Sequence, residues 1–204
     1  MKSKFLSLLI LLFIIIVVDY AEAYTYPLPL SYQPKKEFPS LQQKFGSTLG
    51  LAPFRDERLE QSYIGIHIPV RGLTTHFESS PSPLKRALQE SLSAALSRSG
   101  MKVVSISDWD GTPESMKNIE TDSVLMIEIK KFWTEGRASL FGTTIQTTVQ
   151  LVIHLGVKHE GKVFTRKADV EKEMTVPRST PEKVEAIINE MLTDIFDRYF
   201  SSPY

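Results

Sequence analysis

Alternating apolar and polar residues between Thr143 and Lys158 constrain the fold more than any other feature of the sequence. The apolar set occupies odd-numbered positions: Ile145, Val149, Leu151, Ile153, Leu155 and Val157. A period of two places alternate residues on opposite faces of a β-strand, whereas a helix would scatter them around its circumference. Because a buried parallel strand reads apolar on both faces, the pattern predicts a long antiparallel strand with one buried and one solvated face.

Long strands are also predicted on both sides of this one. Ser123 to Arg137 alternates in the same way, and its phase slips at Lys130–Lys131, which indicates a β-bulge. Lys162 to Val176 follows a tight turn at Glu160–Gly161 and is expected to return as an antiparallel partner. The three stretches together predict a meander.

Two amphipathic helices are expected to cover the buried face. The first has Ser82 as its N-cap and Pro83 at the first helical position, and it ends at Gly100. The second follows Thr180–Pro181 and carries an apolar stripe as far as Tyr199. The predicted fold class is therefore α+β, an antiparallel meander sheet with two amphipathic helices packed on one face.

Shorter elements are predicted between the first residues and the meander. A first strand is expected from Leu41 to near Pro53, and a second over Tyr63 to Val70. Gly72 to Pro81 is expected to be a loop. A short strand over Met101 to Ile106 and a weak helical turn over Thr112 to Ile119 complete the order.

The first residues indicate export. Lys2 and Lys4 precede an apolar run, Leu6 to Val18, and Ala21-Glu22-Ala23 supplies the small residues of a cleavage site. The run is shorter than the roughly 20 residues of a membrane-spanning helix. A cleaved signal and a periplasmic location are expected, with an uncleaved anchor as the alternative. The expected organisation is a signal peptide at 1–23, a Pro-rich linker at 24–40, one α+β domain at 41–200 and a tail at 201–204.

Composition excludes several classes of function. The 24 basic and 24 acidic residues cancel, so no net field favours nucleic acid or anionic lipid as a partner. The chain has no cysteine. This excludes disulfides, thiolate metal sites, a cysteine nucleophile and a lipid attached to an N-terminal cysteine.

No pattern of catalytic or cofactor-binding residues is evident. Gly156 to Lys162 matches most of a phosphate-binding loop, but Val163 replaces the Ser or Thr that must ligate Mg²⁺. The segment also forms a hairpin turn rather than a strand-to-helix turn. The four histidines show no metal-ligand spacing. We therefore expect no catalytic residue, cofactor or metal, and no enzymatic activity.

Two groups of residues are candidates for contact with a partner. They are Arg55, Asp56, Arg58, Gln146, Gln150 and His154. Arg55 to Arg58 is either an ordinary charged turn, a recognition turn or a buried ion pair that fixes the exit of a strand. The solvated face of the central strand carries Thr and Gln but no formal charge before Lys158. Such side chains can be buried by a partner without desolvating a charge. The alternative is a face covered by the chain's own 72–81 loop.

The segment APFRDER, Ala52 to Arg58, resembles the strand and D-x-R signature of YajG-type envelope lipoproteins. The helix ending at Gly100, the stretch Thr121 to Leu125 that opens the meander, and the last helix follow the same order. The resemblance covers roughly residues 46–200. It implies an α+β layout shared with auxiliary lipoproteins of lipid-trafficking transporters and with peptidoglycan-synthase activators, and a non-enzymatic role. The chain departs from that family in lacking the lipidated cysteine.

Three functions are compatible with these observations. The first is a secreted, non-enzymatic binding or assembly module that contacts an envelope protein or polymer. The second is an accessory subunit of a lipid or envelope-component transporter, with an apolar groove between helix and sheet. The third is a hydrolase with an unrecognised site. No transmembrane span is expected after signal cleavage, and the chain can form a homo-oligomer.

Overall fold

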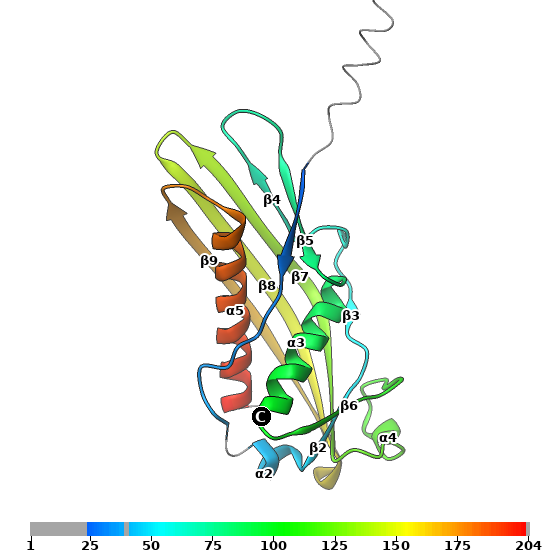
Figure 1. Cartoon of the computed structure of the whole chain (residues 1–204). Coiled ribbons are helices and arrows are strands. Elements are labelled where there is room, and N and C mark those ends of the chain that lie inside the picture. The colour runs from blue at the N-terminus through cyan, green and yellow to red at the C-terminus, as the bar shows by residue number, and fades with distance from the viewer. Residues whose placement is uncertain (1–23, 39–40, 203–204) are drawn as a thin grey trace, which may run out of the picture.

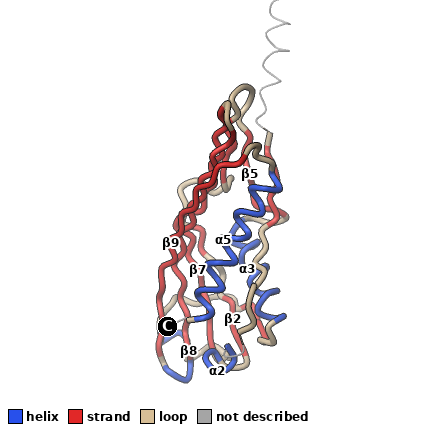
Figure 2. Tube along the Cα trace, turned by 90° about the vertical axis from the view of Figure 1, so that its left-hand side faces the viewer, coloured by secondary structure: helices blue, strands red, loops and turns tan. Residues whose placement is uncertain are grey.

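A computed structural model describes residues 24–38 and 41–202 of the chain. One large mixed sheet forms the molecule, and two long helices, α3 and α5, lie side by side on the same face of it (Figures 1 and 2). The expected signal peptide at 1–23 lies outside the described residues.

In the described part of the chain, the elements follow one another as a mixture of short and long strands with four α-helices. In chain order they are β1 (Thr25–Pro29), α2 (Leu41–Phe45), β2 (Thr48–Leu51), β3 (Arg55–Asp56), β4 (Gly65–Ile68), β5 (Thr75–Ser80), α3 (Leu84–Arg98), β6 (Lys102–Ser105), α4 (Pro113–Met116), β7 (Ser123–Ser139), β8 (Gly142–Val157), the 3₁₀ turn η1 (Lys158–Glu160), β9 (Lys162–Val176) and α5 (Pro181–Ser201).

The three long strands pair as the alternation predicts. β8 lies between β7 and β9 and is antiparallel to both. The register of β7 shifts between Ile129 and Lys131, at the expected bulge. Ile145, Val149 and the other odd-numbered apolar residues of β8 are buried, and its even-numbered polar residues face outward.

The rest of the sheet is not antiparallel, so the prediction of a purely antiparallel meander is corrected. β7 pairs with β8 along one edge. Along its other edge it pairs with β2, β3 and β4 in turn, and all three run parallel to it. The register pairs are Leu49–Ser123, Arg55–Glu128 and Gly65–Thr134. β6 is parallel to β2, and β1 is parallel to β5. Parallel pairs need a crossover connection, and α3 lies in the one between β2 and β6.

The two long helices bury the apolar face of the sheet. Leu92 of α3 and Leu192 of α5 are fully buried and belong to one core with Ile153 of β8. The Thr180 hydroxyl accepts a hydrogen bond from the Lys183 N–H, which confirms the predicted cap of α5.

The start of α3 differs from the prediction. Pro83 occupies the N-cap position, and Ser82 lies one residue outside the helix. The Ser82 hydroxyl donates to the Glu90 carboxylate instead of capping the backbone. Gly100, with φ of 86°, follows the C-cap and ends the helix as expected.

The expected Pro-rich linker is instead part of the core. Residues 25–29 form β1, and Leu28, Tyr32 and Phe38 are buried. The Tyr32 hydroxyl donates a 2.9 Å hydrogen bond to Asp197 of α5, and burial together with this carboxylate raises the pKa of Tyr32. Prolines suit an extended strand at the edge of a sheet, so they did not prevent pairing here.

Two shorter predictions are also corrected. The expected loop at 72–81 contains β5, which is antiparallel to β4. The expected first strand begins as a helical turn, α2, and becomes extended only at Thr48. Leu41 and Phe45 are four residues apart and both buried, which is the spacing of one helical face.

A second, smaller core covers part of the sheet face opposite α3 and α5, at the end where β7 begins and β8 ends. Trp109 and Met116 pack there against Val124 and Met126 of β7. Gly156 provides the space, because a Cβ atom at this position would lie 2.6 Å from the Met116 sulfur. The 106–121 segment therefore closes this end of the face and leaves the rest of it open.

Candidate functional site

The candidate site is the uncovered part of the sheet face opposite α3 and α5, which we call the outer face. It is formed by outward-facing side chains of the three long strands. They are Glu128, Lys131, Trp133 and Glu135 of β7, Gln146, Thr148, Gln150, Val152 and His154 of β8, and Thr165, Lys167, Asp169 and Glu171 of β9. The predicted residues Gln146, Gln150 and His154 lie together here.

Each of these three residues of β8 is held by a partner on β9. Gln146 donates to the Glu171 carboxylate, and Gln150 donates to Asp169 over 3.1 Å. The Nδ1 atom of His154 lies 2.9 Å from the Thr165 hydroxyl. The pairs repeat along the two strands and fix the orientation of the polar groups before any partner binds.

The same register changes the expected charge of the surface. Although β8 itself carries no formal charge before Lys158, β9 adds Lys167, Asp169 and Glu171 beside it. The outer face is therefore a pattern of neutral amides between charges of both signs, and the expectation of a neutral face is corrected. The 72–81 segment pairs with β4 and β1 and does not cover these residues.

A cluster of charges centres on Glu128 of β7. Its carboxylate lies 2.8 Å from the Lys130 ammonium, 3.7 Å from the Arg55 guanidinium and 3.6 Å from Nε2 of His154. Lys130 also contacts Glu57. The hydrogen bond from Lys130 is the main reason that the pKa of Glu128 lies below its usual value, and the same bond raises the pKa of Lys130. Arg55 and His154, distant in sequence, are thus joined through Glu128.

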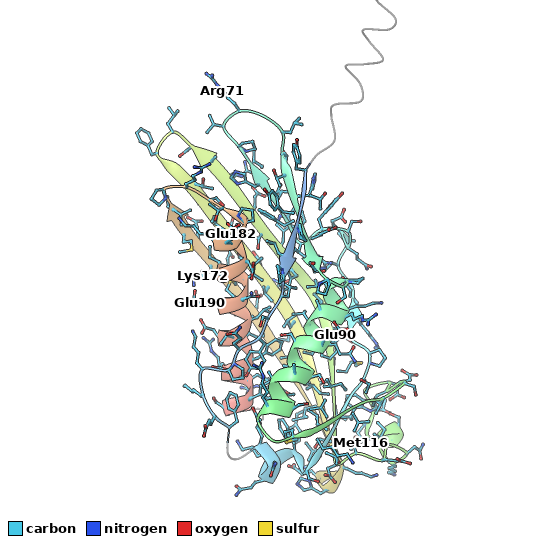
Figure 3. The ribbon with its side chains drawn as sticks, viewed as in Figure 1. Arg71, Glu90, Met116, Lys172, Glu182 and Glu190 are labelled. Carbon is cyan, nitrogen blue, oxygen red and sulfur yellow. The ribbon has the colours of Figure 1, made fainter. Side chains whose placement is uncertain are left out.

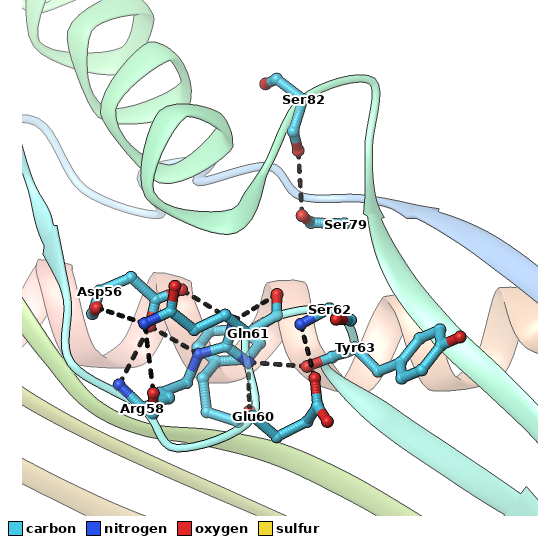
Figure 4. A network of polar contacts seen from close by, with 9 residues as sticks. Asp56, Arg58, Glu60, Gln61, Ser62, Tyr63, Ser79 and Ser82 are labelled. Atoms are coloured by element: carbon cyan, nitrogen blue, oxygen red, sulfur yellow. Dashed lines mark hydrogen bonds and ion pairs between the residues drawn. The ribbon is translucent and has the colours of Figure 1, made fainter.

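Arg58 and Asp56 do not take part in this surface. The Arg58 guanidinium is buried beneath the turn, where it pairs with both carboxylate oxygens of Asp56 (Figure 4). It also donates to the carbonyl oxygens of Tyr63, Gln61 and Phe132. Among the alternatives for this turn, the geometry is that of a buried ion pair that fixes the exit of β3.

The sequence candidates omitted the centre of the charge cluster. The sequence signal for them is that Glu128 and Lys130 are charged residues within an otherwise apolar strand. Only the parallel pairing of β3 with β7 places Arg55 opposite Glu128. Asp169 and Glu171 became candidates only once the register of β9 was known.

A small hollow lies between β9 and α5, on the helix side of the sheet. It measures about 180 Å³ and has apolar walls from Ile153, Val170 and Ile195. Arg166 and Arg198 also line it. The neighbouring Tyr199 hydroxyl is buried and has no hydrogen-bond partner among the described residues, and burial raises the pKa of this phenol.

Within residues 24–38 and 41–202, no three His, Cys, Asp or Glu side chains are grouped to hold a metal ion. In the same part of the chain, no helix has the length and apolar content needed to cross a membrane.

Comparison with known proteins identifies the fold but not a family. No family model matches the chain, and no curated protein sequence matches it. A crystal structure from Xanthomonas campestris, of family DUF330, has a TM-score of 0.57 at 18% identity and covers 87% of this chain and 93% of its own. An uncharacterized protein of known structure has a TM-score of 0.50 at 14% identity, covering 90% and 100%.

A lipoprotein of Neisseria meningitidis is more distant, with a TM-score of 0.41, 15% identity, and coverage of 74% and 99%. At their identities of 18% and 14%, the Xanthomonas structure and the uncharacterized protein show a shared fold alone. The finer resemblance to YajG-type lipoproteins is not confirmed by these structures and stays a prediction.

Proposed function

We propose that the protein is a non-enzymatic binding or assembly module of the bacterial cell envelope. It is exported to the periplasm and acts through contact of its outer face with an envelope protein or polymer. The observation that carries this proposal is the ladder of polar pairs between β8 and β9, in which Gln146, Gln150 and His154 are held in place on an uncovered surface.

Such a surface suits recognition because its polar groups are already ordered. Amides and hydroxyls can exchange water for a partner's groups at a smaller desolvation cost than isolated charges. Ordering before binding also reduces the side-chain entropy lost on association. The charges around Glu128 then supply orientation and selectivity rather than most of the affinity.

The free edge of β9 extends the same surface. Among the described strands β9 pairs only with β8, so no described strand lies along its other side between residues 165 and 176. An unpaired edge can accept an added strand from a partner protein. This favours a protein as the partner.

A photo-crosslinking amino acid at Thr148, between the two glutamines, tests the proposal in intact cells. The matched control carries the same group at Lys85, an exposed position on α3. The proposal requires a discrete adduct from Thr148 that is missing from Lys85. Absence of an adduct at Thr148, or the same adducts from both positions, would show that the outer face is not the contact surface.

The hollow between β9 and α5 favours a second candidate function, an accessory subunit of a lipid or envelope-component transporter. Part of its wall is apolar, and two arginines line it together with Lys167 and Asp169. The volume lies below the range of about 300–1,000 Å³ typical of ligand sites, so it suits only the end of an acyl chain. Mass spectrometry of a solvent extract tests this function. Co-purified lipid should disappear in Val170→Trp, which fills the hollow, and remain in Thr148→Trp on the other face.

A further inference from the structure

Exposed apolar side chains gather at one end of the molecule. The residues concerned are Tyr24, Tyr26, Val70, Leu73, Leu140 and Phe141. They are six of the eight large hydrophobic side chains that the described residues expose. Leu140 and Phe141 are 87% and 95% exposed, so neither contributes to the core. We call the segments that carry them, 24–26, 69–74 and 139–142, together with 177–179, the apolar tip.

Strand pairing places these four segments at the same end. β4 ends opposite the end of β7, since Ile68 lies level with Arg137. The turn after β7 joins β8, and β8 begins opposite Val176, where β9 ends. β1 starts beside β5 at the same level. Figure 1 shows these ends together at the top of the molecule, and Figure 3 shows Arg71 projecting beyond them.

The charge of the apolar tip has one sign. Its four segments contain Arg71 and Arg178 and no Asp or Glu. The chain as a whole has equal numbers of basic and acidic residues, so this is a local departure. Apolar and aromatic side chains next to arginine are the combination that binds the interface of an anionic bilayer.

The position of Tyr24 supplies an independent argument. Tyr24 is the first described residue, and its carbonyl oxygen accepts a 2.8 Å hydrogen bond from the His76 N–H at this end. The apolar run Leu6 to Val18 therefore joins the fold at the apolar tip. A segment with this composition enters a membrane during export, whether or not it is later removed.

We infer that the apolar tip inserts into the interface of a bilayer containing anionic phospholipid. Leu140 and Phe141, on the turn between β7 and β8, enter the acyl boundary together with Leu73, and Arg71 lies at the phosphates. The long strands then project away from the membrane, which leaves the outer face free. This contact is separate from the proposed partner contact at Thr148, and either can fail without the other.

The chain has no cysteine, so a single introduced one can carry an environment-sensitive fluorophore. Full-length protein labelled at Leu73→Cys is mixed with vesicles of phosphatidylethanolamine and phosphatidylglycerol, with phosphatidylcholine vesicles as the neutral comparison. The matched control is Leu59→Cys, since Leu59 is, like Leu73, an exposed leucine but lies between β3 and β4, away from the apolar tip. The readouts are the emission shift and quenching by a lipid-bound quencher.

Insertion predicts a blue shift and quenching at position 73 with anionic vesicles, and neither at position 59. Adding Leu140→Ser and Phe141→Ser should reduce the apparent vesicle affinity read at position 73 by about tenfold or more, because two large apolar side chains no longer enter the lipid. Adding Arg71→Ser should weaken the preference for anionic vesicles, because Arg178 is then the only arginine left in the four segments of the apolar tip. An unchanged melting temperature shows that these exposed changes leave the fold intact.

Three results would overturn the inference. The first is no shift at position 73. The second is an equal shift at position 59, which would mean that the leader alone brings the chain to the lipid. The third is a shift at position 73 that depends on protein concentration without vesicles, which would make the apolar tip a protein–protein contact.

Discussion

Arg58 and Asp56 form a two-pronged ion pair beneath the turn after β3, with Nε to Oδ1 and Nη2 to Oδ2 both at 2.8 Å. Their side chains are only 4% and 9% exposed. The pair closes the segment between β3 and β4, because Arg58 also donates to the Tyr63 carbonyl oxygen at the start of the return. A motif that looks like a surface turn in sequence is therefore an internal clamp.

Removal of this clamp should destabilise the fold. Arg58→Ala leaves the Asp56 carboxylate buried and unpaired, and we expect a loss of about 3–5 kcal/mol in the free energy of unfolding. Arg55→Ala is the matched control, since its side chain is 45% exposed, and its change should stay within about 1 kcal/mol. Urea unfolding measures both. Equal midpoints for the two variants would contradict the clamp.

The stripe of α5 should prove essential to stability. Leu192 is fully buried in the main core, so Leu192→Ala should cost about 2–5 kcal/mol. Leu140→Ala changes the same side chain at an exposed position and should leave the urea midpoint almost unchanged. A Leu192→Ala protein with the wild-type midpoint would show that α5 does not contribute to the core.

Asp122 should make stability depend on acid pH. Its carboxylate accepts hydrogen bonds from the hydroxyl and N–H groups of Thr48 and Ser47 at the start of β2, and these bonds, those of Thr48 foremost, lower its pKa. A lowered pKa stabilises the folded state above the unfolded value, near about 3.9, and this contribution is lost as the pH falls through the folded value.

The Asp122→Ala protein should therefore have a lower urea midpoint than wild type at neutral pH. The difference should begin to shrink as the pH falls below about 4, where the carboxylate of the unfolded chain takes up a proton, and should shrink further as the pH falls through the lowered pKa of the folded state. Asp122→Asn keeps an oxygen acceptor and should lie between the two. A difference that stays constant across this pH range would show that the charge of Asp122 does not matter.

Two lysines on the outer face should block partner capture without unfolding the protein. In Gln146→Lys with Gln150→Lys, each new ammonium lies beside Glu171 or Asp169, so the melting temperature should hardly change. The added charges must be desolvated by a partner, so the adduct at Thr148 should weaken strongly. Undiminished capture would place the contact elsewhere, and an unfolded double variant would mean that this face is internal.

The elements with long periodic patterns were predictable from sequence. Strands β7, β8 and β9, the bulge at Lys130 and the cap at Thr180 each depend on residues close together in the chain. Period two or 3.6 repeated over many residues leaves little choice of secondary structure. The outward position of Gln146, Gln150 and His154 follows from the same periodicity.

Only the tertiary structure showed that half of the sheet is parallel and which charged residues surround Glu128 in the candidate site. Strands of two to six residues, such as β3 and β5, carry too little periodic signal to reveal either their existence or their direction. Residues 24–38 look like a linker in the sequence, but they form β1 and a segment whose Tyr32 is buried and hydrogen-bonded to α5.

The chemistry of the site shows the same division. Sequence alone determined which side chains of β8 face solvent, because alternation is a local property of an extended chain. It could not show that Arg55 meets Glu128, that Gln146 meets Glu171, or that Arg58 is buried, since each depends on which strands pair and in which register. Pairing is set by the free energy of the whole fold, to which distant residues contribute as much as neighbours do.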